Sequence, residues 1–213
     1  MDTFDADTET VEYINEDIIE DQKNALRAGV RKRRARLTAS QRNAYAEQWA
    51  QTVTRFIDKA DIVAAYVSVG DEPPTHALLD SLLAKGVKIL LPKLGPTLKR
   101  EWAWYRGAED LSVQAPGRPP EPSGRSLPSE VLADVQVLII PALTVDQYGH
   151  RLGQGGGWYD RILKLVRPGT KVGAMVYPEE FIDEPLPQDN MDMRVTHAIL
   201  PDSIEACCPP RLS

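Results

Sequence analysis

The sequence of 213 residues has few cysteines and no long apolar run, and both shortages exclude large classes of protein. Its two cysteines, Cys207 and Cys208, are adjacent, so they cannot cross-link distant parts of a fold, and no metal-ligand spacing surrounds them. No apolar run approaches the roughly 18 residues of a membrane-spanning helix. The first 22 residues lack the basic and then apolar order of a secretory signal peptide. We therefore expect a protein of the reducing cytoplasm with no membrane partner.

Charge of one sign is missing from each of two neighbouring stretches. Residues 1–22 hold nine acidic residues and no basic one, so the rest of the chain carries a net +3 against −6 for the whole. An acidic stretch of this kind predicts a solvated, disordered extension over residues 1–21, followed by one domain over residues 22–213. Residues 23–36 hold seven basic residues and no acidic one. This run has no interleaved aromatic residues, so we interpret it as a solvated helix face rather than a nucleic-acid contact.

Segments with the periodicity of a helix alternate with short apolar runs after residue 20. One helix is predicted over residues 21–37. A second helix begins at the capping box of Thr38 and Gln41, and a third is predicted over residues 75–86. Residues 98–111 predict an edge strand or hairpin, and the proline-rich residues 113–130 predict an ordered loop. Buried strands are predicted over residues 61–69, 87–92, 131–143, 171–178 and 195–201. The alternation predicts an α/β fold, a three-layer sandwich with a mostly parallel central sheet flanked by helices.

Residues 145–165, VDQYGHRLGQGGGWYDRILKL, hold four glycines within five positions, between an apolar run and a predicted helix. Backbone without Cβ atoms turns tightly and brings its N–H groups close to phosphate oxygens. The two common nucleotide loops are both absent, because Trp158 replaces the last glycine of a G-x-G-x-x-G pattern and no lysine follows as a Walker loop requires. A phosphate cradle and a structural turn therefore remain alternatives on glycine content alone.

The residues beside this loop favour the phosphate cradle. Arg151 precedes the glycines and can neutralise phosphate charge. Asp160 follows the loop, where a carboxylate suits a magnesium ion that bridges phosphate oxygens. The alternative role of Asp160 is to stabilise the helix start as an acid of its first turn. His76, His150 and His197 show no triad or metal spacing and are interpreted as structural.

The segment GHRLGQGGGWYDRIL resembles the signature of the 5-formyltetrahydrofolate cyclo-ligase family, G-x-R-L-G-x-G-x-G-[aromatic]-Y-D. The segments KNALR, YVSVGDEPPT, ILLPK, PPEP and LPQDNMDMRVTHAIL are similar to further family elements and occur in the family's order. The resemblance extends over residues 22–202. It implies an α/β enzyme that uses MgATP to convert 5-formyltetrahydrofolate to 5,10-methenyltetrahydrofolate, ADP and phosphate.

The resemblance also implies roles for individual residues. Arg151 and Lys23 are implied as catalytic groups, and Asp160 and Asp192 as magnesium-linked carboxylates. The implied folate contacts are Val67, Glu72, Gln154, Gly155, Gly156, Gly157 and Trp158. The implied ATP contacts are Lys23, Asn24, Ala25, Leu26, Arg27, Arg151, Leu152, Gly153, Gln154, Gly155, Gly156, Gly157, Trp158 and Tyr159.

The chain departs from the family pattern at three places. Trp158 stands where phenylalanine or tyrosine is usual, the pair Glu179 and Glu180 stands where many members have a glutamine, and His197 stands where an acid is common. None of these positions is an implied phosphate ligand, and a monomeric enzyme with ATP and the folate as its partners is expected. The departures keep a second hypothesis open, a divergent paralogue that binds nucleotide but lacks folate cyclo-ligase activity.

Overall fold

The computed structural model describes residues 6–94 and 99–208, with side chains from residue 17 onward, and its centre is an eight-stranded sheet. The five strands from β12 to β2 run parallel, with antiparallel strands on both sides. This arrangement confirms the predicted α/β fold with a mostly parallel sheet. In order across the sheet, the strands are β13 (Ile204–Ala206), β12 (His197–Ile199), β10 (Lys171–Met175), β7 (Val137–Pro141), β1 (Ile62–Ala64), β2 (Lys88–Leu94), β3 (Arg100–Trp104) and β6 (Leu127–Pro128).

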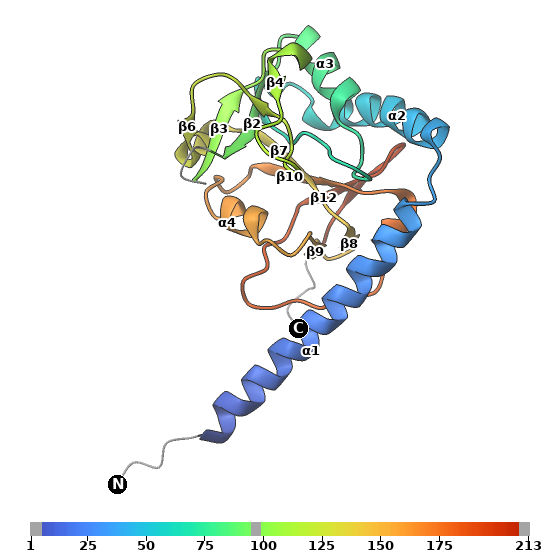
Figure 1. Ribbon diagram of the computed structural model, residues 1–213, viewed down its shortest axis with the longest axis vertical. Coiled ribbons are helices and arrows are strands. Elements are labelled where there is room, and N and C mark those ends of the chain that lie inside the picture. The colour runs from blue at the N-terminus through green and yellow to red at the C-terminus, as the bar shows by residue number, and fades with distance from the viewer. Residues whose placement is uncertain (1–5, 95–98, 209–213) are drawn as a thin grey trace.

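Alternate side chains of the central strands feed two hydrophobic cores, one on each face of the sheet. Ile139 belongs to the core under α2 (Ala39–Ile57) and α3 (His76–Ala84), whereas its neighbour Ile140 belongs to the core under α4 (Trp158–Leu163). Both faces of β7 are therefore buried, which explains why its sequence is a continuous apolar run. Figure 1 shows α2 and α3 on one side of the sheet and α4 on the other, as a three-layer sandwich requires.

Helix α1 (Ala6–Arg34) is longer than the helix predicted from residue 21. The helix runs through the acidic stretch because no glycine or proline interrupts residues 6–28. Lys23, Arg27, Val30 and Arg34 repeat at helical spacing and are buried, so one face of α1 lies on the domain while its first turns project beyond it (Figure 1). The division into an extension and a domain stays a prediction, and residues 1–5 lie outside the described residues.

This burial corrects the interpretation of the basic run as a solvated face. Three of its seven basic residues, Lys23, Arg27 and Arg34, face the domain and are at most 7% exposed. The Arg34 guanidinium donates from Nε and Nη2 to the Glu180 carboxylate, at 2.7 Å each, and from Nη2 to the Ala142 carbonyl at 2.6 Å. Charged residues on a helix end thus serve to fasten α1 to the sheet.

The glycine loop does not follow the buried strand β7 directly. A hairpin of β8 (Thr144–Asp146) and β9 (Arg151–Leu152) intervenes, and β11 (Phe181–Ile182) pairs with β8. Asp146 is fully buried and accepts hydrogen bonds from the backbone N–H groups of Tyr148, His150 and Leu186. Its carboxylate also lies 2.6 Å from Nδ1 of His150. The hairpin therefore holds the start of the glycine loop in a fixed position.

The proline-rich segment contains more regular structure than predicted. It includes the short strands β5 (Glu121–Pro122) and β6, the strand β4 (Leu111–Ser112) directly precedes it, and the 3-10 helix η2 (Ser129–Asp134) begins at its end. The Lys93 ammonium at the end of β2 donates to the carbonyls of Pro122 at 3.0 Å and Gly124 at 2.7 Å. These bonds attach the segment to the carboxyl end of the sheet.

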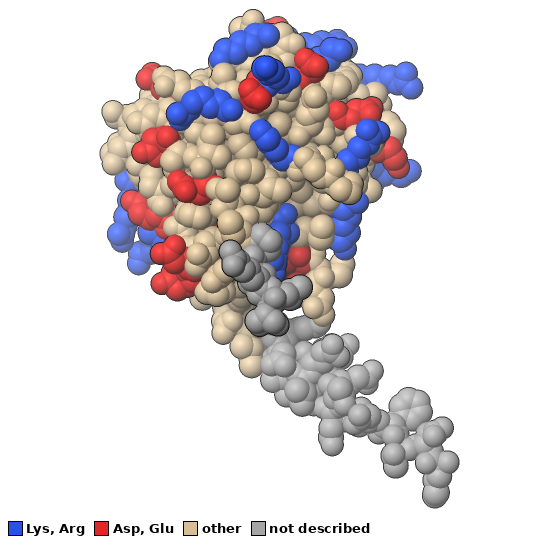
Figure 2. Space-filling view, turned by 180° about the vertical axis from the view of Figure 1, so that it is seen from behind, with Lys and Arg blue, Asp and Glu red and all other residues tan. Residues whose placement is uncertain are grey.

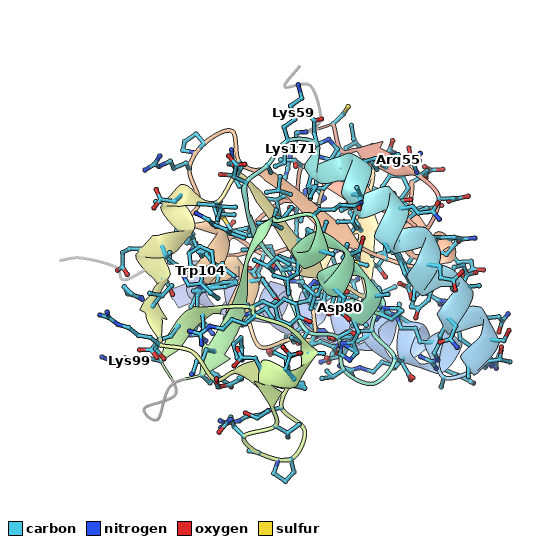
Figure 3. The ribbon with its side chains drawn as sticks, turned by 90° about the horizontal axis from the view of Figure 1, so that it is seen from above. Arg55, Lys59, Asp80, Lys99, Trp104 and Lys171 are labelled. Carbon is cyan, nitrogen blue, oxygen red and sulfur yellow. The ribbon has the colours of Figure 1, made fainter. Side chains whose placement is uncertain are left out.

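The two ends of the parallel strands differ in character. Lys59 precedes β1 and Lys171 begins β10, so both mark the amino ends of the strands, where they lie together in Figure 3.

Trp104, also labelled in Figure 3, packs with Trp102 on the core under α4, which confirms that the two tryptophans share one face of β3. None of the helices in the described residues combines the length and apolarity that a membrane span requires.

Candidate functional site

A cavity of about 490 Å³ opens at the carboxyl ends of β1, β2 and β7. Tyr66 and Val67 follow β1, Lys93 lies near the end of β2, and Ala142 follows β7. The remaining walls come from α1, the glycine loop with α4, the proline-rich segment and the turn at residues 189–192. Open α/β sheets bind their ligands at this edge, so the cavity is the candidate site.

The glycine loop forms one wall of this cavity between β9 and α4. Gly155 has φ of 102° and Gly157 has φ of 58°, a region that side chains with a Cβ rarely adopt. The Gly153 carbonyl accepts a hydrogen bond from Nε of Arg27 at 3.0 Å. The loop conformation therefore depends both on glycine and on a cation of α1.

Arg27 and Arg151, the two arginines predicted to contact phosphate, are each paired with a carboxylate. Nη1 of Arg27 lies 2.7 Å from Oε1 of Glu20, two turns earlier in α1. Nη2 of Arg151 lies 2.6 Å from Oδ1 of Asp160, which also accepts from the Met193 N–H at 3.1 Å. The Arg151 side chain is only 3% exposed, so this pair lies at the base of the loop rather than in solvent.

Lys23, the third cation, bridges two carboxylates. Its Nζ lies 2.7 Å from Oδ2 of Asp189 and 2.6 Å from Oδ2 of Asp192. Burial alone would lower the pKa of the Lys23 ammonium, but the hydrogen bonds and charges of the two aspartates outweigh burial and raise the pKa. Lys23 therefore stays protonated and ties α1 to the turn at residues 189–192.

Glu72 is the acid on the opposite wall, in the loop after β1. Its Oε2 accepts from the Val69 N–H at 3.0 Å. Burial raises the pKa of the Glu72 carboxyl, and this shift is opposed by the Val69 bond, the Arg34 charge and a hydrogen bond with Gln154. Gln154, at the tip of the glycine loop, also accepts from Nη2 of Arg31 at 2.7 Å. Gln154 thus attaches the tip of the glycine loop to α1.

The structure brings most of the predicted site residues into one cavity. Asn24, Ala25 and Leu26 are the exceptions, because they lie on the exposed face of α1 outside the cavity wall. Asn24 still contacts the site indirectly, since its Oδ1 accepts from Nη1 of Arg27 at 2.7 Å. The predicted residues that line the cavity are Lys23, Arg27, Val67, Glu72, Arg151, Leu152, Gly153, Gln154, Gly155, Gly156, Gly157, Trp158, Tyr159, Asp160 and Asp192.

The two carboxylates predicted to be magnesium-linked each have one oxygen available. Arg151 occupies Oδ1 of Asp160 and Lys23 occupies Oδ2 of Asp192, while the second oxygen of each accepts no hydrogen bond from the described part of the chain. Residues 17–94 and 99–208 contain no cluster of three or more His, Cys, Asp or Glu side chains with metal-binding geometry. Magnesium is usually held by one or two carboxylates together with substrate phosphates, so these two aspartates fit that ion.

Sequence reasoning missed several residues that line the cavity. Glu20 was assigned to the acidic extension, although its spacing of seven from Arg27 places both on one face of a helix. Asp189 precedes Asp192 by three positions in QDNMD, a spacing typical of turns that carry two carboxylates side by side. Lys93 and Glu121 lie in the segments ILLPK and PPEP, which resemble family elements, but no role was predicted for either residue, because their place in the wall depends on how the proline-rich segment folds back onto β2.

Comparison with known proteins relates the chain to one group. A sequence model of the 5-formyltetrahydrofolate cyclo-ligase family matches residues 19–201. The 5-formyltetrahydrofolate cyclo-ligase of Mycolicibacterium smegmatis is 39% identical over 65% of this chain and 73% of its own length. The enzyme of that name from Escherichia coli is 28% identical over 82% of this chain and 98% of its own length.

A solved structure gives the same relation. The 5,10-methenyltetrahydrofolate synthetase of Aquifex aeolicus superposes with a TM-score of 0.74 at 26% identity, covering 90% of this chain and 95% of that chain. The synthetase of Mycoplasma pneumoniae superposes with a TM-score of 0.64 at 17% identity, which supports the fold alone.

Proposed function

Because the chain belongs to the 5-formyltetrahydrofolate cyclo-ligase family, we propose that it converts 5-formyltetrahydrofolate to 5,10-methenyltetrahydrofolate while MgATP becomes ADP and phosphate. The family match confirms the resemblance drawn from the sequence. The observation that carries the proposal is that one cavity joins three cations suited to phosphate with Glu72, a half-buried carboxylate suited to a folate ring.

The ATP end of the cavity lies between α1 and the glycine loop. Lys23, Arg27 and Arg151 would neutralise the triphosphate, and backbone N–H groups of the loop would donate to its oxygens. Asp160 and Asp192 would hold magnesium bound to the nucleotide, where the ion neutralises phosphate charge. The fit of their free oxygens supports this assignment.

The folate end lies along Val67, Glu72 and the tip of the loop. The Glu72 carboxylate accepts hydrogen bonds, and a pterin edge offers amino and ring N–H donors. Trp158 lines the cavity and packs against Trp102, with ring centroids 5.5 Å apart, so its own ring is held for contact with an aromatic ligand. The two substrates would therefore meet at the loop tip.

The chemistry requires alignment rather than a protein nucleophile. The formyl oxygen attacks the γ-phosphorus and ADP leaves, which gives a phosphorylated imine-like intermediate. The second folate nitrogen then attacks the formyl carbon and loses its proton, and phosphate departs as the ring closes. Lys23 and Arg151 would stabilise the negative charge that spreads over the transferring phosphoryl group. Positioning two substrates in one cavity supplies much of the remaining rate enhancement.

The departures from the family pattern do not alter this proposal. Glu180 is engaged with Arg34, and His197 on β12 lies against Phe56, with ring centroids 5.0 Å apart; neither lines the cavity. Trp158 lines it as an aromatic residue, as the pattern requires. Basic and acidic side chains are interspersed on the face shown in Figure 2, which supports the expectation of no nucleic-acid partner.

We also propose a monomer that acts in the cytoplasm. Cys207 and Cys208 are free thiols, as in a reducing compartment. Sedimentation of the purified protein would measure its mass in solution.

The decisive experiment mixes the purified protein with 5-formyltetrahydrofolate and MgATP and follows the absorbance band of the methenyl product. An ATP-dependent rise is expected, and folded protein without such a rise would refute the proposed reaction. Calorimetry that detects ATP binding but no folate binding would instead support the nucleotide-binding paralogue.

The site assignment is tested by Arg151→Ala, because this change removes a phosphate cation and leaves Asp160 without its partner. Turnover should fall at least about tenfold, as expected for a charge-assisted contact. Lys59→Ala, an exposed cation at the amino ends of the strands, is the control and should keep wild-type rates. Unchanged kinetics in Arg151→Ala would remove this residue from the site.

A further inference from the structure

Every cation assigned to the triphosphate is already engaged by a carboxylate of the same cavity. Arg27 is paired with Glu20, Arg151 with Asp160, and Lys23 with both Asp189 and Asp192. Three cations thus face four carboxylates, which gives this set a net charge of −1. A triphosphate that takes the cations releases the carboxylates, and each released carboxylate then needs another source of positive charge or solvent.

The four carboxylates differ in how easily they tolerate this release. The Glu20 side chain is 55% exposed, so water can solvate it. Asp160 and Asp192 are assigned to magnesium, which replaces the lost cation. Asp189 has no such cation, although its side chain is 37% exposed and can be solvated, whereas the side chain of its partner Lys23 is only 6% exposed. The Lys23 ammonium therefore has little access to water if it loses both aspartates at once.

The geometry of the turn at residues 189–192 holds Asp189 in place for Lys23. Its Oδ1 accepts from the Met191 N–H at 2.8 Å, which leaves Oδ2 directed to Nζ of Lys23 at 2.7 Å. Oδ2 of Asp192 accepts both from Lys23 at 2.6 Å and from the Asp189 N–H at 2.9 Å. Two carboxylates are thus fixed on one ammonium, although one would satisfy its charge.

We propose that Asp189 is a positioning residue that retains Lys23 when the magnesium of the bound nucleotide binds the free oxygen of Asp192 and so weakens the attraction of that carboxylate for Lys23. Lys23 then does not depend on a carboxylate that it shares with the metal ion, and the lysine keeps its ammonium at the phosphates. This inference rests on the proposed function, because it assumes that MgATP binds in this cavity. It predicts that the contribution of Asp189 depends on the metal rather than on the nucleotide alone.

A purely structural role makes a different prediction. If Asp189 only shapes the turn, its loss weakens nucleotide binding equally with and without magnesium. If it retains Lys23, its loss leaves Lys23 with Asp192 alone and weakens binding only when a metal ion shares that carboxylate. Binding without metal should be unchanged or tighter in the variant, because one negative charge near the phosphates is gone.

The test compares wild type, Asp189→Asn, Asp189→Glu and the control Asp134→Asn by calorimetry with a non-hydrolysable ATP analogue. Each protein is titrated once with magnesium and once with a chelator. Met191 and Lys23 use different oxygens of Asp189, and Asn replaces one of these oxygens by an NH2 donor, so in this orientation it cannot accept from both. Asp134 is a surface acid that is 66% exposed, and its substitution removes the same charge elsewhere.

In Asp189→Asn the Kd with magnesium should rise about tenfold while the Kd with chelator stays level or falls. Asp189→Glu should recover most of the magnesium enhancement, and Asp134→Asn should match wild type. An equal loss under both conditions, or an unchanged magnesium enhancement, would overturn the proposal while leaving the proposed function standing. A wild-type protein that binds no nucleotide would instead refute the proposed function, and this inference with it.

Discussion

Replacing Gly156 by alanine separates the phosphate-binding role of the glycine loop from its role in folding. No heavy atom outside the neighbouring residues lies within 4 Å of the position that a Cβ would occupy at Gly156, and its φ lies outside the left-handed region. The methyl group therefore meets no protein atom, and the folded chain accepts it without strain. The free energy of unfolding should stay level or rise by about 0.4–1 kcal/mol, because alanine restricts the unfolded chain more than glycine does.

Nucleotide binding should respond in the opposite direction. The loop lines the cavity, so the new methyl group occupies space in which a phosphate oxygen would approach the backbone N–H groups. A hydrogen bond to a charged group contributes about 1.5–3 kcal/mol, so its loss should raise the Kd for MgATP about ten- to a hundredfold.

The assay pairs calorimetry with thermal unfolding on Gly156→Ala and on the control Gly29→Ala. Gly29 lies within α1, where the nearest atom to an added Cβ is Nη1 of Arg33 at 3.7 Å, an ordinary contact. The control should gain about 1 kcal/mol of stability from helix propensity and keep the wild-type Kd. A Gly156→Ala protein that is stable and binds MgATP as wild type does would refute the phosphate cradle.

Two further predictions concern buried charges. Arg34→Leu should lower the free energy of unfolding at pH 7 by about 3–5 kcal/mol, because it leaves Glu180 buried without its partner, and Arg34→Leu with Glu180→Leu should recover most of this loss in denaturant melts. A double variant that is as unstable as Arg34→Leu alone would contradict the ion-pair argument. Burial raises the pKa of Glu72, so the folded state binds the proton of this carboxyl more tightly than the unfolded state does. The contribution of Glu72 to the free energy of unfolding therefore falls as the pH rises from 4.5 through the raised folded pKa. Glu72→Gln should therefore gain stability relative to wild type across that pH window, and a difference that does not vary with pH would contradict the assigned cause.

Local signals in the sequence predicted much of the fold. The capping box of Thr38 and Gln41 is confirmed, with the Thr38 side chain accepting from the Gln41 N–H and the Gln41 side chain accepting from the Thr38 N–H. The run VLIIP is a buried central strand, because both of its faces are covered and no polar alternation is needed. These features depend on neighbours a few residues apart, so the sequence displays them directly.

Features that depend on distant contacts were not predictable in the same way. The basic residues of α1 look like a solvated face until the partners of Lys23 are known, and those partners lie 166 and 169 positions away. The strand predicted over residues 61–69 is regular only at β1, because the chain then leaves the sheet to line the cavity with Tyr66 and Val67. In both cases tertiary contacts override the local pattern.

The candidate site shows the same division. The glycines with Arg151 and Asp160 were found because they are close in sequence, and the structure places them in one cavity wall. Glu20 and Asp189 were missed because each acquires its role only through a cation on another part of the structure or another turn of a helix. A lone acid has no distinguishing pattern until its partner is known.

The pre-paired cations of the cavity have a consequence for the anions that surround the protein in a cell. A cluster of unpaired arginines and lysines would attract inorganic phosphate, nucleic acids and free nucleotides alike through its positive potential. Six basic and six acidic residues line the cavity, so its wall has no formal net charge and no excess of positive charge that would attract small anions. A ligand that brings its own divalent ion supplies a partner for both signs of charge, so the ion pairs favour such a ligand over anions that carry no metal.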